Sequence, residues 1–284
     1  MSVSVTVDLV ILTVRDDELQ VLLVERGNPP FEGQLALPGG YLHGRETLDE
    51  AALRELKEET GVDGTRLHLE QLRTYSDPER DPRGRVITAA YLALGPNLPT
   101  PVAGTDAREA YWVPVKAVTQ EGALAFDHVH ILRDAVERGR SKLEYTTVAT
   151  VFCTEPFTVG DLRRVYEVIW GMPLDPSNFR RKITRADGFL EPTGDRRIQA
   201  PGRPASLYRK GSASLLMPPF LRTPSPTDPR VGLSIHTDHL ANVTLAEVEA
   251  SWDSVSGASR CYGSRGVRVV ESAGGDRDGG ERPP

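Results

Sequence analysis

The sequence predicts an α/β protein followed by a smaller, mostly helical module and a long polar tail. Three observations lead to this class. Strand-like and helix-like segments alternate through the first half of the chain, as in a sheet covered by helices. The net charge changes from −8 over residues 1–140 to +4 over residues 141–211. Residues 212–284 are rich in Gly, Pro and Ser, a composition typical of disorder.

The composition of the 284 residues is that of a soluble globular protein, with 39% hydrophobic and 26% charged residues. The longest apolar run, near residues 7–14, contains Asp8 and is too short to cross a bilayer. No secretory signal is visible at the N-terminus. Two cysteines cannot form a disulfide framework. We therefore expect a cytoplasmic protein that has no contact with a membrane.

The first half of the chain is predicted to form one domain over residues 3–140. Residues 3–14 read as a strand, and residues 18–25 as its hairpin partner. Further strands are expected at 35–37, 85–94 and 110–113, and helices at 47–60 and 128–138. The order of these elements predicts a mixed sheet in an α/β/α sandwich.

The second half begins with two predicted helices. Residues 158–169 place apolar side chains at helical spacing, and Thr158 is the expected N-cap. Gly171 and Pro173 are expected to end this helix. A second helix begins after its expected N-cap Asp175, with Pro at its first position, and ends near residue 186. Two short strands around a polar loop are expected at 189–191 and 206–209. This order predicts a winged helix-turn-helix domain over residues 143–211, with a disordered tail at 212–284.

A helix rich in carboxylates carries the strongest chemical signal. Thr47 and a glutamate three residues later form a capping box, and Gly61 is the expected C-terminal cap. Glu55, Glu58 and Glu59 fall at positions i, i+3 and i+4, so they share one face and repel one another. Oxygen ligands suit Mg²⁺ or Mn²⁺, which would relieve that repulsion. A solvated acidic face is the alternative interpretation.

The spacing of these residues resembles a known signature. Residues 40–46, then seven residues, then residues 54–62 match nine fixed positions within 23 residues. The segment before them, Leu35–Leu37 and a Pro-Gly-Gly turn, supplies the strand and loop that the motif requires. The chain is therefore identified as resembling the Nudix superfamily over about residues 3–140.

The Nudix resemblance implies hydrolysis of a pyrophosphate bond in a nucleoside diphosphate derivative, with a divalent cation. It implies that Glu58 and Glu59 are the main metal ligands and that Glu55 is a ligand or the general base. Helical spacing also allows Arg54 to pair with Glu50 or Glu58 and so to help hold the orientation of the carboxylates. The Gly39-Gly40 pair and Glu46 would lie against the substrate. The identity of the base remains open at this point.

The second predicted helix of the winged helix-turn-helix resembles a DNA-reading helix. Its free face carries Asn178, Arg181, Lys182 and Arg185, which can neutralise phosphates or bond base edges. Arg196 and Arg197 are expected in the loop between the final strands, as a basic wing. A solvated charged face, or a winged helix used for protein contacts, is the alternative.

The pairing of the two domains resembles the NrtR-like regulators of NAD metabolism over about residues 3–211. The segments that carry this resemblance are residues 125–128, 155–158, 162–167, 174–175, 178–182 and 203–209. That resemblance implies a homodimer that binds an operator in double-stranded DNA and senses ADP-ribose or a related dinucleotide. Because the Nudix signature is complete, we expect a hydrolase of an ADP-ribose-like compound with a regulatory domain. The alternative is a repressor that binds ADP-ribose without cleaving it, and a third is a hydrolase whose winged helix serves dimerisation.

Overall fold

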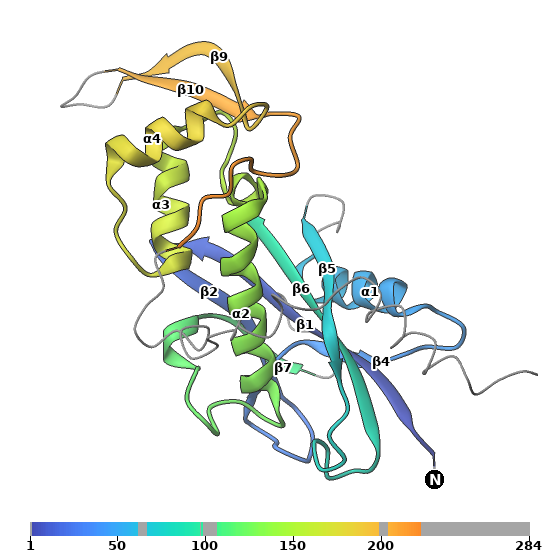
Figure 1. Ribbon diagram of the computed structural model, residues 1–284. Helices are drawn as coiled ribbons and strands as arrows, with labels where there is room; N and C mark the ends of the chain where they lie inside the picture. The colour runs from blue at the N-terminus through green and yellow to red at the C-terminus, as the bar shows by residue number, and fades with distance from the viewer. Residues whose placement is uncertain (1, 62–66, 97, 99–106, 199–203, 223–284) are drawn as a thin grey trace, which may run out of the picture. The chain divides into compact units, whose positions relative to one another are not determined.

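A mixed sheet between two helices forms the first part of the molecule, followed by a three-stranded winged helix (Figure 1). This computed structural model describes residues 2–61, 67–96, 98, 107–198 and 204–222. The elements of the first part are β1 (Ser4–Arg15), β2 (Glu18–Arg26), β3 (Leu35–Ala36), β4 (Gly39–Tyr41), α1 (Leu48–Thr60), β5 (His68–Tyr75), β6 (Val86–Pro96), β7 (Ala107–Pro114) and α2 (His128–Tyr145). Two 3-10 turns lie at η2 (Val115–Ala117) and η3 (Val148–Phe152).

Strand β1 is the centre of the sheet. It runs parallel to β6 along eleven residue pairs and antiparallel to both β2 and β4. The strands follow the order β3-β2-β1-β6-β5, with β4 paired to β1 and β7 to β2. The mixed sheet is therefore confirmed, and β5 is a strand that the sequence analysis did not name.

Successive side chains of β1 point to opposite faces of the sheet, so they pack against different helices. Val7, Leu9 and Ile11 pack in one apolar cluster with Leu56 of α1. Val10 and Leu12, one residue out of phase, pack in another with α2. Helices α1 and α2 therefore cover opposite faces, as the predicted sandwich requires. Asp8 lies two residues before Val10 and therefore points to the same face, so its carboxylate lies on the α2 side.

The winged helix consists of β8 (Phe157–Thr158), α3 (Val159–Trp170), α4 (Pro176–Arg185), β9 (Leu190–Arg197) and β10 (Ala205–Lys210). Thr158 and Asp161 form a capping box at α3, and Gly171 ends the helix with φ of 70°. Asp175 caps α4 by accepting a hydrogen bond from the Asn178 N–H. These predicted caps are confirmed, and strand β9 extends beyond the expected residues 189–191.

One apolar core extends from the sheet into the winged helix. The cluster that contains Leu12 of β1 also contains Leu162 of α3 and Phe179 of α4. The Arg140 Nε donates to the Ile169 carbonyl at 2.9 Å, which ties α2 to α3. Helix α2 itself runs to Tyr145 and so crosses the domain boundary expected at residues 140–143. The boundary is therefore a point on a continuous helix.

Residues 212–222, which we call the C-terminal strap, were expected to be part of a disordered tail, but they are folded against α2. The backbone of the C-terminal strap bonds to the end of α2, with Leu216 N–H to the Tyr145 carbonyl at 2.8 Å. Leu216 is 2% exposed. Leu216 and Phe220 of this segment belong to the core beside α2, while Leu215, Met217 and Leu221 are exposed. A Pro- and Ser-rich composition does not reveal that contact. Residues 223–284, including the helix expected near 240–252, lie outside the described residues.

No helix within the described part of the chain combines the length and the apolar character that crossing a membrane requires.

Candidate active site and nucleic-acid interface

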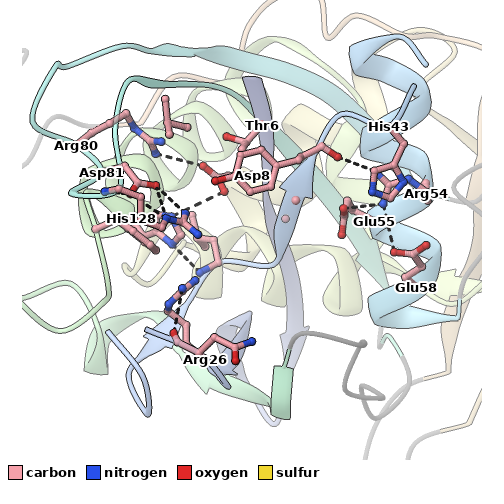
Figure 2. Close-up of a pocket in the computed structure, with 18 of the residues that line it drawn as sticks. Thr6, Asp8, Arg26, His43, Arg54, Glu55, Glu58, Arg80, Asp81 and His128 are labelled. Carbon is pink, nitrogen blue, oxygen red and sulfur yellow. Dashed lines mark hydrogen bonds and ion pairs between the residues drawn. The ribbon is translucent and has the colours of Figure 1, made fainter. Parts of the chain in front are cut away.

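A cleft of about 290 Å³ opens beside β1, between α1 and the residues that lead into α2. Figure 2 shows its two sides, with Arg54, Glu55 and Glu58 on one and Asp8, Arg80 and His128 on the other. The predicted residues Gly39 and Gly40 also line it. The cleft therefore brings Gly39, Gly40, Arg54, Glu55 and Glu58, which the sequence analysis predicted for this site, together with a second group that it did not single out.

Arg54 organises the α1 side of the cleft. Its guanidinium binds both oxygens of Glu46, at 2.9 and 3.1 Å, and donates from Nη1 to Glu55 at 2.7 Å and to Glu58 at 3.3 Å. Arg54 and the His43 backbone N–H lower the pKa of Glu46 to about 2. Burial raises the pKa of Glu55, against the effect of Arg54. The expected pairing of Arg54 with Glu58 is present, while Glu50 is occupied by the capping box.

The Gly39-Gly40 pair allows the close packing around Glu55. A Cβ on Gly40 would lie 2.2 Å from the Glu55 Oε1, and a Cβ on Gly39 would lie 2.2 Å from the Val7 carbonyl. A side chain at either position would displace the carboxylate or the neighbouring strand β1. Both glycines therefore position the cleft as well as line it.

The carboxylates of α1 suit a divalent cation. Glu55 Oε1 and Glu58 Oε2 both lie within hydrogen-bonding distance of one Arg54 nitrogen, so they converge on a point that already holds a positive charge. Carboxylate oxygens are the ligands that Mg²⁺ prefers. Among the described side chains, no three His, Cys, Asp or Glu residues form a metal cluster. Glu59 belongs to α1, but its side chain lies outside the described residues.

The opposite side of the cleft is built on a buried ion pair. Arg80, with 4% of its side chain exposed, binds both oxygens of Asp127 at 2.7 and 3.0 Å and reaches Asp8 at 3.3 Å. His128 Nδ1 accepts the Leu37 N–H at 2.9 Å, and its Nε2 lies 3.8 Å from Asp8. Burial lowers the pKa of His128. Because Nδ1 accepts a hydrogen bond, it carries no proton, and the ring proton lies on Nε2.

Two arginines and two aromatic rings line the mouth of the cleft. Arg83 is bound by Asp81 at 2.7 and 3.0 Å and lies over the rings of Tyr41 and Phe126, at 5.8 and 5.4 Å from their centroids. Arg26 lies 4.7 Å from the centre of Phe126. Cationic and aromatic groups are thus concentrated opposite the carboxylates of α1.

Sequence reasoning missed this second side for a physical reason. An aspartate inside an otherwise apolar strand, as at Asp8, was the available signal, because buried charges need partners. Asp127 and His128 stood in a segment already noted as typical of the family, without an assigned role. Arg80 lies 72 residues from Asp8 in the sequence, and no spacing rule connects them.

Helix α4 presents a basic face that is mostly in solvent. Phe179 and Ile183 are buried as predicted, and Asn178, Arg181 and Arg185 are exposed. Arg181 donates to the Asn178 side chain at 2.7 Å, so these two residues hold each other in place. Lys182 places its Nζ 4.5 Å from the centre of the Phe220 ring in the C-terminal strap. All four predicted DNA-binding residues of α4 are therefore exposed, and one of them, Lys182, also contacts an aromatic ring.

The wing residues differ from their expected placement. Arg196 and Arg197 belong to strand β9 instead of the loop that follows it. Arg197 binds Asp161 of α3 at 2.8 Å and the Pro156 carbonyl at 3.0 Å, so it fastens β9 to the N-terminus of α3. Arg196 is exposed. Both residues lie in the strand because β9 continues to Arg197, beyond its expected end at residue 191.

The sheet between α1 and α2, with its glycine turn and carboxylate helix, defines a Nudix domain, and the module after it defines a DNA-binding type of winged helix. Family models agree: a NUDIX domain matches residues 5–135, and an NrtR DNA-binding winged helix domain matches residues 151–209. The chain belongs to the NrtR family of Nudix-related proteins.

Individual relatives support this assignment. The chain is 35% identical over 206 residues to the ADPR responsive transcriptional repressor NtrR of Acinetobacter baylyi, covering 72% of this chain and 80% of that protein. It is similar to Shewanella oneidensis NrtR in complex with a 27mer DNA, with a TM-score of 0.63, 36% identity and coverage of 78% and 99%. It is 43% identical over 117 residues to the ADP-ribose pyrophosphatase of Methanocaldococcus jannaschii, covering 40% and 64%.

Proposed function

We propose that this protein is a DNA-binding regulator whose cleft binds ADP-ribose or a closely similar nucleoside diphosphate derivative. The observation that carries the proposal is the division of one cleft into a carboxylate side and an arginine and aromatic side. A regulator in the same family is described as responsive to ADP-ribose, and another is crystallised with DNA.

The mouth of the cleft has the chemistry that such a ligand needs. The Arg83 guanidinium can bind phosphate oxygens with two parallel hydrogen bonds, and its pairing with Asp81 holds it in place. The rings of Tyr41 and Phe126 offer apolar surface for a base or a ribose. Arg83 is partly exposed, so a ligand can reach it without opening the buried Arg80 cluster.

Hydrolysis of the pyrophosphate is the second function that the site supports. Glu55 and Glu58, together with Glu59, would hold a divalent cation such as Mg²⁺, which would neutralise phosphate oxygens when bound. Gly39 and Gly40 would let the ligand approach Glu55. Glu46 holds Arg54 in place, and Arg54 in turn orients the carboxylates. Relatives of the catalytic class include an ADP-ribose pyrophosphatase.

Release of AMP tests the second function against the first. Wild-type protein is incubated with ADP-ribose and Mg²⁺, beside Glu58→Gln and Glu59→Gln, with Glu191→Gln on the exposed strand β9 as the matched control. If wild type and the control release AMP and the two variants do not, the result supports hydrolysis as a function of the site. Binding of ADP-ribose in a calorimeter without turnover supports a non-catalytic sensor, and no binding at all contradicts both.

DNA binding is proposed to use the exposed face of α4, with Asn178 and Arg181 toward bases and Arg185 and Arg196 toward phosphates. A homodimer would match a two-fold operator, and we propose that state as well. A gel shift with a duplex from the region upstream of the protein's own gene, with and without ADP-ribose, tests this function. Binding that does not weaken as salt rises would contradict phosphate contacts.

A further inference from the structure

The C-terminal strap lies outside the winged-helix match, which ends at residue 209, yet it is bonded tightly to the domain. Its backbone makes two hydrogen bonds with the end of α2, Leu216 N–H to the Tyr145 carbonyl at 2.8 Å and Phe220 N–H to the Glu144 carbonyl at 2.7 Å. A third joins the residues just after α2, from the Thr147 N–H to the Ser214 carbonyl at 3.1 Å. Because hydrogen bonds hold the C-terminal strap near both of its ends, its position against α2 is fixed.

A buried cation secures the far end of the C-terminal strap. Arg222 has 8% of its side chain exposed and pairs with Glu144 at 3.0 Å and with Glu137, both on α2. Glu144 is itself a buried residue at 8% exposure. Because a charge shielded from water needs its partners, removing Arg222 would take a counter-charge away from both carboxylates.

Phe220 joins the C-terminal strap to the helix that is proposed to read DNA. Its ring lies 5.7 Å from Phe179 of α4 and 5.1 Å from Trp170 of α3. On the other side, the Lys182 ammonium of α4 lies 4.5 Å from the ring centre, a cation–π contact. Helix α4 has only ten residues and two buried side chains, Phe179 and Ile183. Phe220 packs against the first of them together with Tyr166, whose ring lies 5.2 Å from that of Phe179.

Helix α2 connects this packing to the cleft. It begins at Asp127 and His128, which line or support the cleft beside Arg80, and it ends at the residues that hold Arg222 and Phe220 (Figure 1). A rigid helix transmits a shift at one end to the other. The C-terminal strap thus stands between the helix that starts at the ligand site and the helix with the basic face.

We propose that Phe220 and Arg222 of the C-terminal strap are positioning residues for α4, and that through α2 they link the orientation of this helix to occupancy of the cleft. The positioning is argued from the contacts of the strap alone. The link to ligand and DNA rests on the proposed function, and the experiment separates the two.

Amide hydrogen exchange of the full-length protein tests the positioning. We expect Phe220→Ala and Arg222→Gln to speed exchange in α4 about tenfold, because loss of local packing lowers the free energy of local opening. Helix α1, on the opposite face of the sheet, should exchange at the wild-type rate. Leu221→Ala is the matched control, since Leu221 lies between the two residues but is 66% exposed. Arg222→Lys, which keeps the charge, should restore most of the protection.

Unchanged exchange in α4 for both variants would overturn the proposal. Equal acceleration in α1 and α4 would also overturn it, since it would show general destabilisation. If Phe220→Ala does not fold, Phe220→Leu, which keeps an apolar side chain but loses the ring contacts, replaces it with the same expected direction.

The same proteins are then titrated with the duplex from the upstream region, with and without ADP-ribose and Mg²⁺. We expect Arg222→Gln to bind DNA more weakly and to lose most of the response to ADP-ribose, while its affinity for ADP-ribose stays within about twofold of wild type. A full response in this variant would overturn the link to the cleft. If wild type binds no duplex, the proposed DNA function fails, and the exchange result still decides the positioning.

Discussion

The cleft and the exposed face of α4 are both rich in arginine, but the arginines of the two regions differ in burial and in their pairing with carboxylates. In the cleft, Arg54 and Arg80 each bind two or more carboxylates, and Arg80 is almost fully buried. On α4, Arg181 and Arg185 lie in solvent, and Arg181 bonds only to a neighbouring amide among the described contacts. The cleft is preorganised before any ligand binds, and the α4 face is not.

This difference indicates two kinds of recognition. Fixed charges in a shielded cleft discriminate between small ligands by geometry, because a misplaced group leaves a buried charge without a partner. Exposed arginines bind a polyanion chiefly because their binding releases its counterions. The affinity gained in this way depends little on the sequence of the nucleic acid and strongly on the salt concentration. The predictions below test this contrast in order of decreasing effect.

The largest effect is expected from the buried cation of the cleft. Arg80→Ala leaves Asp8 and Asp127 without a counter-charge, and breaking a buried pair in this way costs about 3–5 kcal/mol of stability. Urea denaturation measures the loss. The control is Arg45→Ala in an exposed loop, which should change stability by less than about 0.5 kcal/mol. Similar values for the two variants would remove the distinction between shielded and exposed charge.

A second test moves a carboxylate without removing it. Gly40→Ala places a methyl group 2.2 Å from the Glu55 Oε1, so Glu55 must shift. We expect AMP release from ADP-ribose to fall about 100-fold, as displacement of a reacting group by about 1 Å commonly does. Gly139→Ala is the matched control, because a Cβ there meets nothing within 4 Å. Equal rates in both variants would show that the position of Glu55 is not critical.

On α4 the expected effect is smaller and depends on salt. Arg181→Ala and Arg185→Ala should each weaken DNA binding by about tenfold at low salt and reduce the slope of log affinity against log salt by about 0.9. Titration at several salt concentrations measures both quantities. Lys57→Ala, an exposed cation of α1, is the control. A slope that is unchanged in both α4 variants would exclude this face as the phosphate-binding surface.

The smallest effect concerns the pH dependence of Glu46. Its pKa is lowered from 4.5 to about 2 by Arg54 and the His43 N–H, so the folded state favours the ionised form. The stabilisation is present above pH 4.5 and is lost as the pH falls toward 2. Glu46→Gln should therefore make urea midpoints less sensitive to pH between about 4.5 and 2. An unchanged pH profile would show that this ion pair contributes nothing to folding.

Local chemistry determined much of this structure from the sequence alone. The capping box of α1, the glycine that ends it and the caps of α3 and α4 are where their spacing predicted them, because each depends on residues within one helical turn. The strand expected at residues 3–14 likewise forms as β1. The signature of residues 40–62 predicted the family and one side of the cleft for the same reason.

Contacts between distant segments needed the tertiary structure. The Asp8–Arg80–Asp127 cluster and the hold of the C-terminal strap on α2 and α4 join residues far apart in the sequence, and no local rule links such residues. Arg197 was expected in a loop and instead binds Asp161, since strand pairing extends β9 past its local signal. Short-range propensity fixes helices, caps and strand faces, while burial and charge pairing across the fold decide which side chains meet.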